Sequence, residues 1–350
     1  MTSPFIQNIL QEFNLQGSQF TATPLTAGLI NDTYLVTDGS EQQYILQKIN
    51  LQVFPNAAML MDNINHALPL LHAENYARIT FLTTRTGANF LIQQTDIWRM
   101  MTYISDSTTY NTTTNSTIAF EAGRIIGLFH KLLEKADIQL FKDTLPKFHN
   151  LHHRIQEFED ALCTANSQNS SVAAVAIEKA RHFIKELQEI DNEKLPVRIC
   201  HNDTKLNNIL FSKSTEKALC LIDLDTIMKG YFHYDFGDAI RTIVNTAPED
   251  EQNHDLITFE KTLFESFVDG LASNGQILTL EEKNSLALGA VFMPFIHGLR
   301  ALTDYLNNNT YYKVTYQNQN LDRCLSLFYF AEKALQHKDY MTTYILEKLG

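Results

Sequence analysis

The side chains best suited to chemistry lie in two short stretches between residues 200 and 226. The first, 201–208, reads HNDTKLNN and is followed by the apolar run ILF. The second, 219–225, reads LCLIDLD, a buried-strand pattern that ends in two carboxylates. Side chains at alternate positions of a strand share one face, so Asp223 and Asp225 are expected to project together from the strand end.

Two carboxylates this close repel each other unless a cation or hydrogen-bond donors neutralise them. Mg²⁺ suits such a site because it combines one or two carboxylates with phosphate oxygens. In the first stretch, four residues separate Asp203 from Asn208, the spacing of the kinase catalytic loop. The pattern predicts phosphoryl transfer, with Asp203 as the catalytic residue that accepts the hydroxyl proton. Asn208, Asp223 and Asp225 are the predicted metal ligands, Asp225 either directly or by orienting another ligand.

A second acidic motif, Asp235-Phe236-Gly237, spells the DFG of protein kinases, but it follows the wrong strand for that role. We expect a short helix to begin there, with Asp235 as its N-cap. His201 is expected to brace the catalytic loop rather than to act as a base.

The segments HNDTKLNNILF, LIDLDT and YDFGDAIR together resemble the aminoglycoside phosphotransferase and choline kinase superfamily. Within it, the chain is most similar to the N-acetylhexosamine kinase group, which phosphorylates the anomeric hydroxyl of GlcNAc and GalNAc. The segments GLINDTY, YILQKIN and LRALTDYL extend the resemblance over nearly the whole chain in the family's order. The resemblance implies ATP and Mg²⁺ as cofactors and a sugar as phosphoryl acceptor.

The nucleotide is expected to bind in the first part of the chain. The resemblance implies that the backbone of 100–104 reads the adenine edge and that the turn 26–33 lies over the phosphates. By pattern alone, these segments are equally a core strand and an ordinary hairpin. A strand cation should reach the phosphates; we favour Lys48, although Gln47 aligns with the family's basic position and a surface lysine is the alternative. The predicted nucleotide-binding residues are Asn31, Thr33, Gln47, Lys48, Met101 and Tyr103.

The acceptor is expected to bind in the second part of the chain. LRALTDYL resembles the segment that lines the sugar pocket of the family, so Arg300 is expected to fix a hydroxyl or the acetamido carbonyl. On spacing alone, Arg300 and Asp304 stand at i and i+4 of a helix and also suit a surface ion pair. The predicted substrate-binding residues are Asp203, Lys205, Arg300, Asp304, Tyr305 and Tyr312.

Composition narrows the class of protein. The 350 residues carry a formal net charge of −12 and are 44% hydrophobic, which is typical of a globular enzyme and argues against nucleic acid or an anionic membrane as partner. The four cysteines lack metal-site spacing. The N-terminal sequence does not resemble a signal peptide, and no window is apolar enough for a transmembrane helix. We therefore expect a cytoplasmic protein, a monomer or weak homodimer, whose partners are ATP and a small sugar.

The periodicity of apolar residues predicts an α+β, protein-kinase-like fold with two lobes. Residues 1–103 should form a nucleotide-binding lobe with an antiparallel sheet and a helix, and residues 104–350 a larger, mostly helical lobe for catalysis and substrate binding. Expected strands lie at 32–36, 44–49, 76–82, 90–94 and 97–104. Expected helices lie at 4–14, 56–72, 119–133, 151–163, 172–190 and over much of 256–349, with loops at 105–116 and 164–171.

Three other functions remain compatible with the motifs. Another small-molecule kinase, acting on choline, an aminoglycoside or a different sugar, would share the catalytic residues. A metal-dependent phosphohydrolase would use the Asp223 and Asp225 pair without ATP, but would leave the spacing of Asp203 and Asn208 unexplained. A kinase-like nucleotide-binding protein without activity is the third.

Overall fold

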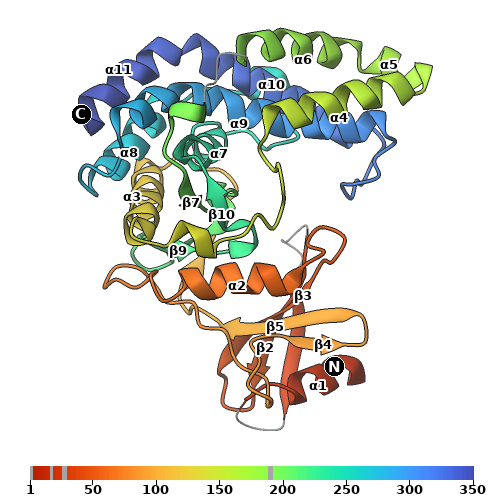
Figure 1. The fold of residues 1–350 in the computed structure, drawn as a ribbon, viewed down its shortest axis with the longest axis vertical. Coiled ribbons are helices and arrows are strands. Elements are labelled where there is room, and N and C mark those ends of the chain that lie inside the picture. The colour runs from red at the N-terminus through yellow and green to blue at the C-terminus, as the bar shows by residue number, and fades with distance from the viewer. Residues whose placement is uncertain (1–2, 16–18, 26–29, 188–191) are drawn as a thin grey trace.

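The computed structural model describes residues 3–15, 19–25, 30–187 and 192–350. An antiparallel sheet of five strands in the order β1-β2-β3-β5-β4 forms the lower part of the molecule (Figure 1). Its strands are β1 (Phe20–Leu25), β2 (Asp32–Asp38), β3 (Gln43–Ile49), β4 (Leu91–Gln93) and β5 (Asp96–Thr102). The predicted kinase-like α+β class is confirmed. The boundary placed at residue 103 stays a prediction.

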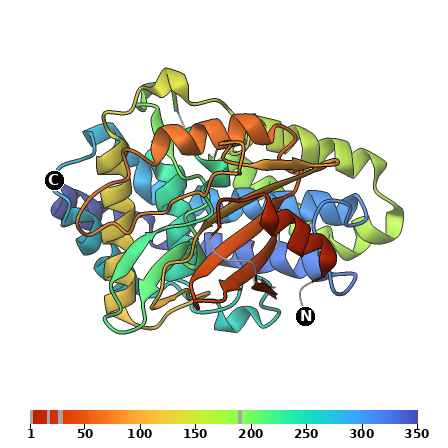
Figure 2. The same ribbon diagram turned by 90° about the horizontal axis from the view of Figure 1, so that it is seen from below.

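The two faces of this sheet are covered differently. Helix α1 (Pro4–Gln11) packs on one face, where Ile9 joins Leu46, Trp98 and Met100 in a separate small core. Figure 2, the view from below, shows α1 in front of the sheet. Helix α2 (Ala57–Ala67) lies between the sheet and the helical part (Figure 1). The side chain of Asn63 ties α2 to that part by donating to the carbonyl oxygens of Ile227 and Lys142, both at 2.8 Å.

One predicted strand is wrong. Residues 76–82 form no named strand; Phe81 makes only an isolated bridge to Met101 of β5. The backbone of this segment instead uses single hydrogen bonds at the sheet edge, from Leu82 N to Met100 O and from Thr102 N to Thr80 O. The segment 76–82, whose β-branched and aromatic residues suggested a strand, therefore packs along β5 in an irregular conformation.

Helices form the upper part of the molecule (Figure 1). They are α3 (Ser116–Leu133), α4 (Leu151–Thr164), α5 (Ser167–Val172), α6 (Ala174–Glu186), α7 (Phe232–Ile243), α8 (Lys261–Ala272), α9 (Leu280–Leu306), α10 (Gln319–Gln336) and α11 (Lys338–Leu349). The predicted loop 164–171 is wrong in part, because α5 begins within it with Asn166 as its N-cap. The prediction that no window is apolar enough for a transmembrane helix is wrong: of the helices in the described residues, α9 alone is long and apolar enough to span a membrane, and 83% of its most apolar window is buried inside the molecule.

Two short sheets hold the stretches that carry the chemistry. The first pairs β7 (Arg198–Cys200) with β10 (Met228–Gly230), and the second pairs β6 (Ser107–Thr108), β8 (Ile209–Ser212) and β9 (Ala218–Leu221). Strand β9 ends at Leu221, so the predicted alternation along one strand up to Asp225 is wrong. Asp223 instead has left-handed backbone angles, φ 60° and ψ 54°, and Asp225 follows in a 3₁₀ turn, η5 (Leu224–Thr226). Asp is among the few residues that adopt this conformation readily.

Candidate active site

The loop between β7 and β8 brings Asp203 and Asn208 together. Its 3₁₀ turn η4 (Leu206–Asn208) brings the Asn208 amide back to Asp203, and Nδ2 donates to both the backbone oxygen and Oδ2 of Asp203 at 2.8 Å. Lys205 Nζ donates to the same Oδ2 at 3.0 Å. One carboxylate oxygen of Asp203 is thus held by two donors, and the side chain is fixed in direction at the cleft.

The charges around Asp203 favour its ionised form. Burial acts to raise the pKa of Asp203, but the Lys205 ammonium and its hydrogen bond outweigh burial and leave this pKa below its usual value. The pKa of Lys205 is correspondingly raised: burial opposes its charge, and Asp203 and Asp223 overcome that effect. Asp203 is therefore a carboxylate at neutral pH, as an acceptor for a hydroxyl proton must be.

We expect Lys205→Gln to move the acidic limb of the kcat/KM profile to higher pH. Removing the ammonium takes away the charge that lowers the pKa of Asp203, so the carboxylate protonates, and activity falls, at a higher pH than in the wild type. The profile should be measured from pH 4.5 to 8 with saturating nucleotide. Lys205→Arg keeps the charge and is the control. A limb that stays in place in Lys205→Gln would show that Asp203 does not control it.

Asp223 and Asp225, the two carboxylates that follow β9, lie in different environments. Asp225 is 2% exposed and is bound on both sides: Arg99 Nη1 lies 2.5 Å from Oδ1, and Asn31 Nδ2 donates to Oδ2 at 2.7 Å. Asp223 faces the solvent of the cleft, yet protein atoms crowd around it. That crowding, together with the charges of Asp225 and Asp203, raises the pKa of Asp223 to about 6.

This arrangement suits a hard divalent cation. Asp203, Asp223 and Asp225 line one cavity, where burial first, and then the charges of Asp225 and Asp203, raise the pKa of Asp223 against the opposing charges of Lys205 and Arg99. An oxygen-ligated cation removes this repulsion, and Mg²⁺ is the one that combines few carboxylates with phosphate. Asp223 and Asp225 thus fit the predicted metal site in residue type and placement, whereas Asn208 is 5% exposed and holds Asp203, and its role as a metal ligand stays a prediction.

A buried carboxylate, Asp235, holds the catalytic loop from behind. It is fully buried and accepts from the backbone N–H groups of His201 (2.8 Å) and Asn202 (2.7 Å) and interacts with His130 Nε2 (2.9 Å). The prediction of Asp235 as an N-cap is wrong, because α7 begins three residues earlier at Phe232. Asp235 lies in the first turn and uses its carboxylate on a distant loop, so the DFG spelling is not a metal motif here.

The loop's own residues complete this support. Asn202 has φ 62° and its Nδ2 donates to the carbonyl oxygens of Cys200 (3.2 Å) and Thr226 (3.1 Å). His201 is fully buried, and its Nε2 lies 2.8 Å from the carbonyl oxygen of Ile222. The predicted role of His201 as a brace agrees with these contacts. Gly230 lies opposite, where a Cβ would come within 2.7 Å of Asn202 Oδ1.

In the sheet, the structure corrects the predicted phosphate cation. Lys48 Nζ pairs with Asp96 Oδ2 at 2.8 Å, and its strand partner Trp98 belongs to the core beneath α1. Because side chains alternate, Lys48 lies on the sheet face away from the catalytic loop, and the prediction that it faces the cleft is wrong. Gln47 takes the cleft side, and its Oε1 accepts from Nε (3.0 Å) and Nη2 (2.8 Å) of Arg99.

Arg99 is the functional residue that sequence reasoning missed. It stands opposite Gln47 in the register of β3 and β5, and its ion pair with Asp225 joins the sheet to the metal-site loop. A lone arginine in an apolar strand, IWRMMT, is the signal that could have found it, because arginine is almost never buried without a partner.

The other predicted nucleotide residues lie as follows. Asn31 Oδ1 accepts from Asn50 N at 3.0 Å while its amide binds Asp225, and Thr33 Oγ1 accepts from Gln47 Nε2 at 3.2 Å. Met101 pairs with Ile45 in the sheet, and Tyr103 N donates to Gln43 O at 3.3 Å. The segment 100–104, which was predicted to read the adenine edge, therefore continues the sheet. Residues 26–29 of the predicted phosphate turn lie outside the described residues.

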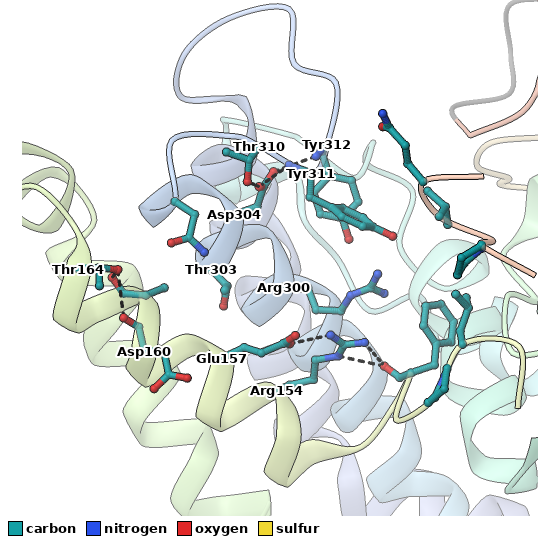
Figure 3. Close-up of a pocket in the computed structure, with 18 of the residues that line it drawn as sticks. Arg154, Glu157, Asp160, Thr164, Arg300, Thr303, Asp304, Thr310, Tyr311 and Tyr312 are labelled. Atoms are coloured by element: carbon teal, nitrogen blue, oxygen red, sulfur yellow. Dashed lines mark hydrogen bonds and ion pairs between the residues drawn. The ribbon is translucent and has the colours of Figure 1, made fainter. Parts of the chain in front are cut away.

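The predicted acceptor cavity has a volume of about 310 Å³ and is lined, among others, by Asp203, Arg300, Tyr311 and Tyr312. The Arg300 guanidinium lies 4.8 Å from the centre of the Phe148 ring and 6.0 Å from that of Tyr311. Within residues 3–15, 19–25, 30–187 and 192–350, no carboxylate forms an ion pair with it, which excludes the surface pair with Asp304. A second cavity of about 660 Å³ continues past Arg300 along α4 and α9 (Figure 3).

Two predicted substrate residues are placed differently by the structure. Asp304 is 5% exposed, and its carboxylate accepts from the backbone N–H of Tyr311 (2.7 Å) and Tyr312 (2.9 Å), as the dashed lines of Figure 3 show. It therefore shapes the loop that carries the tyrosines. Tyr305 is 2% exposed and belongs to the main core, on the side of α9 away from the cavity. Tyr305 lines neither of the two cavities, so the structure does not support its predicted contact with the substrate, whereas Asp304 lines the 660 Å³ cavity and its contact with the substrate stays a prediction.

Charged residues missed by the sequence reasoning also line the acceptor cavity. Glu249 is held between Arg241 and Arg323, whose Nη2 lies 2.6 Å from Oε2. Burial acts to raise the pKa of Glu249, but the two guanidinium groups lower it to about 2. Arg241 also pairs with the buried Asp238 of the same helix at 2.7 Å. Asp238 and Arg241 belong to the motif YDFGDAIR, so the sequence shows these two charged residues. It does not show that Glu249 is the partner of Arg241.

Solved structures of kinases share this fold. A microcompartment-associated aminopropanol kinase has a TM-score of 0.66 at 16% identity, with 97% of this chain and 98% of that chain covered. An aminoglycoside phosphotransferase from Alicyclobacillus acidocaldarius has 0.63 at 14%, with 99% and 98% covered. An amicoumacin kinase in complex with AMP-PNP, Ca²⁺ and the ligand abbreviated Ami has 0.60 at 14%, with 96% and 92% covered.

The family model agrees with the site. The model of the phosphotransferase enzyme family, APH, matches residues 21–266, which include the five-stranded sheet, the catalytic loop and the metal-site carboxylates. The predicted superfamily is thereby confirmed, while the closeness to N-acetylhexosamine kinases stays a prediction. With the loop of Asp203 and Asn208 and the matched region spanning most of its length, the chain belongs to the phosphotransferase enzyme family.

Proposed function

We propose that this phosphotransferase moves the γ-phosphoryl group of ATP to the anomeric hydroxyl of an N-acetylhexosamine, GlcNAc or GalNAc, and releases the sugar 1-phosphate. The observation that carries the choice of acceptor is Arg300, a cation without a carboxylate partner among the described residues, which lines the same cavity as Asp203. The resemblance of its segment, LRALTDYL, to the sugar-binding segment of that kinase group supports the same choice.

The charges of the cavity disfavour a cationic acceptor. Besides the proposed metal ligands, its carboxylates are Asp203, which is paired with Lys205, and Glu249, which two arginines already neutralise. An ammonium group would meet Arg300 and Lys205 with no free carboxylate in exchange. The relatives with the same fold include an aminopropanol kinase and an aminoglycoside phosphotransferase, which are named for amine compounds. Asn111, Asn207, Thr242 and Asn245, which line the cavity here, instead suit the hydroxyl groups of a neutral sugar.

Asp203 is the catalytic residue in this proposal. Its carboxylate, fixed by Asn208 and Lys205, accepts or orients the proton of the attacking hydroxyl. An anomeric hydroxyl is more acidic than an ordinary alcohol, so a carboxylate with a normal or lowered pKa is basic enough. Lys205 lies beside Asp203, where its charge also favours a transferring phosphoryl group.

Asn208, Asp223 and Asp225 would hold Mg²⁺, which would supply charge neutralisation at the phosphates when bound. The complex of the amicoumacin kinase with AMP-PNP and Ca²⁺ supports a nucleotide and a divalent cation for this fold. We propose that Met101 and Tyr103 lie at the adenine, as the resemblance implies.

The proposal is tested by ADP release with MgATP across GlcNAc, GalNAc, glucose, choline and kanamycin, with the product position read by phosphorus NMR. We expect release with the N-acetylhexosamines and an anomeric phosphate. Release only with choline or kanamycin would overturn the acceptor and keep the kinase. No release with any compound, together with no binding of MgATP, would overturn the kinase itself.

We expect Arg300→Leu to raise the KM for GlcNAc by about 10- to 100-fold and to leave the KM for ATP unchanged. The side chain would lose a charge-assisted hydrogen bond to the sugar, and such a bond contributes about 1.5–3 kcal/mol. Steady-state kinetics with each substrate varied would show this split. Arg181→Leu, at an exposed position of α6, is the matched control. An unchanged KM for GlcNAc would remove Arg300 from the acceptor site.

A further inference from the structure

The sheet carries a buried cation that the roles described so far leave unassigned. Arg99 is 2% exposed and directs its guanidinium at the metal-site carboxylate Asp225, at 2.5 Å. Its other two nitrogens bind Gln47 Oε1. The ring of Phe81, 5.6 Å from the guanidinium carbon, and Met61 Sδ, 3.9 Å from Nη1, enclose it. Every polar group of the guanidinium therefore has a neighbour that fixes its direction.

We propose that Arg99 is the cation with which this chain meets the nucleotide phosphates, in place of a lysine on β3. In kinases this charge comes from a lysine on the third strand that pairs with a glutamate of the neighbouring helix. Here Gln47 holds that side of β3, Lys48 points to the other face, and α2 presents Met61 to the cation. The inference rests on the proposed use of ATP and does not depend on which acceptor is phosphorylated.

The register of the sheet allows an arginine on β5 to take the place of a lysine on β3. Gln47 and Arg99 are directly paired on β3 and β5, so they share one face, and their Cα atoms are about 5 Å apart. The long arginine side chain crosses this separation and ends in front of its neighbour on β3. Gln47 is neutral and offers Oε1 as an acceptor, so it orients the guanidinium without cancelling its charge. In the nucleotide-free protein the guanidinium of Arg99 is paired with Asp225.

The place of Asp225 links the cation to the phosphates. Asn31, which donates to the other oxygen of Asp225, immediately precedes β2. Asp225 also lines the cavity together with Asp203 and Asp223. Arg99 thus contacts a proposed metal ligand directly. A phosphate group bound beside Asp225 would meet the positive charge of this guanidinium.

The first test measures ADP binding without metal, by calorimetry in the presence of a chelator. Arg99→Gln alone leaves the buried Asp225 uncompensated and is a poor test because folding itself suffers. We therefore compare Asp225→Asn with the double variant Asp225→Asn plus Arg99→Gln, which differ only in the cation. We expect the double variant to bind ADP about 10- to 100-fold more weakly. Equal affinities in two folded variants would overturn the proposal.

The second test moves the cation from β5 to β3. The variant Gln47→Lys with Arg99→Gln exchanges the two side-chain types across the register pair and keeps one positive charge beside Asp225. We expect it to bind MgADP within about tenfold of the wild type and to keep a thermal shift on nucleotide addition. Lys48→Ala, on the opposite face, is the control and should bind normally. Loss of nucleotide binding in Lys48→Ala, with full binding in the Asp225→Asn plus Arg99→Gln variant, would return the role to Lys48.

Failure of these tests is distinguishable from failure of the proposed function. If the wild type does not bind ADP or ATP at all, the kinase proposal fails. If the wild type binds nucleotide and removing Arg99 changes nothing, only the assignment of the cation fails.

Discussion

The Asp203→Asn variant is expected to lose about 10²- to 10⁴-fold in kcat while binding MgATP with nearly wild-type affinity. The amide cannot accept the hydroxyl proton, and general-base groups contribute about 10²- to 10⁴-fold to rates. The fold should be retained, since the amide oxygen can still accept from Lys205 or Asn208, and the backbone oxygen of residue 203 keeps its own bond to Asn208.

Two measurements separate catalysis from binding in this variant. Calorimetry gives the affinity for MgATP, and single-turnover assays of ADP formation give the rate of the chemical step. Asp223→Asn is the comparison, because loss of a proposed metal ligand should weaken MgATP binding as well as turnover. Near-wild-type turnover in Asp203→Asn would sink the assignment of Asp203. Equal loss of MgATP binding in both variants would place Asp203 at the metal instead.

The Asp235→Ala variant is expected to lose about 3–5 kcal/mol of unfolding free energy. Its carboxylate is fully buried and serves two backbone N–H groups of the catalytic loop and the ring of His130, so removal leaves buried donors without acceptors. Urea denaturation followed by circular dichroism measures the loss. Asp255→Ala, at an exposed position, should change stability by less than about 0.5 kcal/mol. A small change in Asp235→Ala would mean that the loop is held by its other contacts.

Local patterns let the sequence predict much of the fold and the catalytic loop. The spacing of Asp203 and Asn208 spans a single turn, so the chain itself brings the two side chains together. The apolar stripes predicted α1, α3, α4 and most of the last third, because each helix buries one continuous face. Strands β2 and β3 were visible for the same reason, as alternation around a polar turn.

Long-range partners explain what sequence reasoning could not find. Alternation along the strand predicts that Lys48 and Gln47 lie on opposite faces of the sheet. Deciding which of the two faces the cleft requires the position of the catalytic loop, which the sequence does not give. Arg99 is 52 residues from Gln47 and meets it only through strand pairing. Asp235 has the residue type of a helix cap, yet its carboxylate binds a loop more than thirty residues earlier, and no local rule predicts that choice. The backbone partners of Asp304 likewise lie on the loop after its own helix, where spacing along α9 does not reveal them.

The Asp304 anchor has a consequence for how enzymes with this fold could diverge. The loop with Tyr311 and Tyr312 is hydrogen-bonded to the carboxylate of Asp304 on α9, whereas the catalytic loop is hydrogen-bonded to the carboxylate of Asp235 on α7. The two anchors share no hydrogen bond among the described residues. A lineage could therefore exchange the segment between α9 and α10 as a cassette, and acquire a new acceptor after gene duplication, while the inherited phosphoryl-transfer machinery stays intact. Swapping this segment between relatives is the corresponding route for engineering.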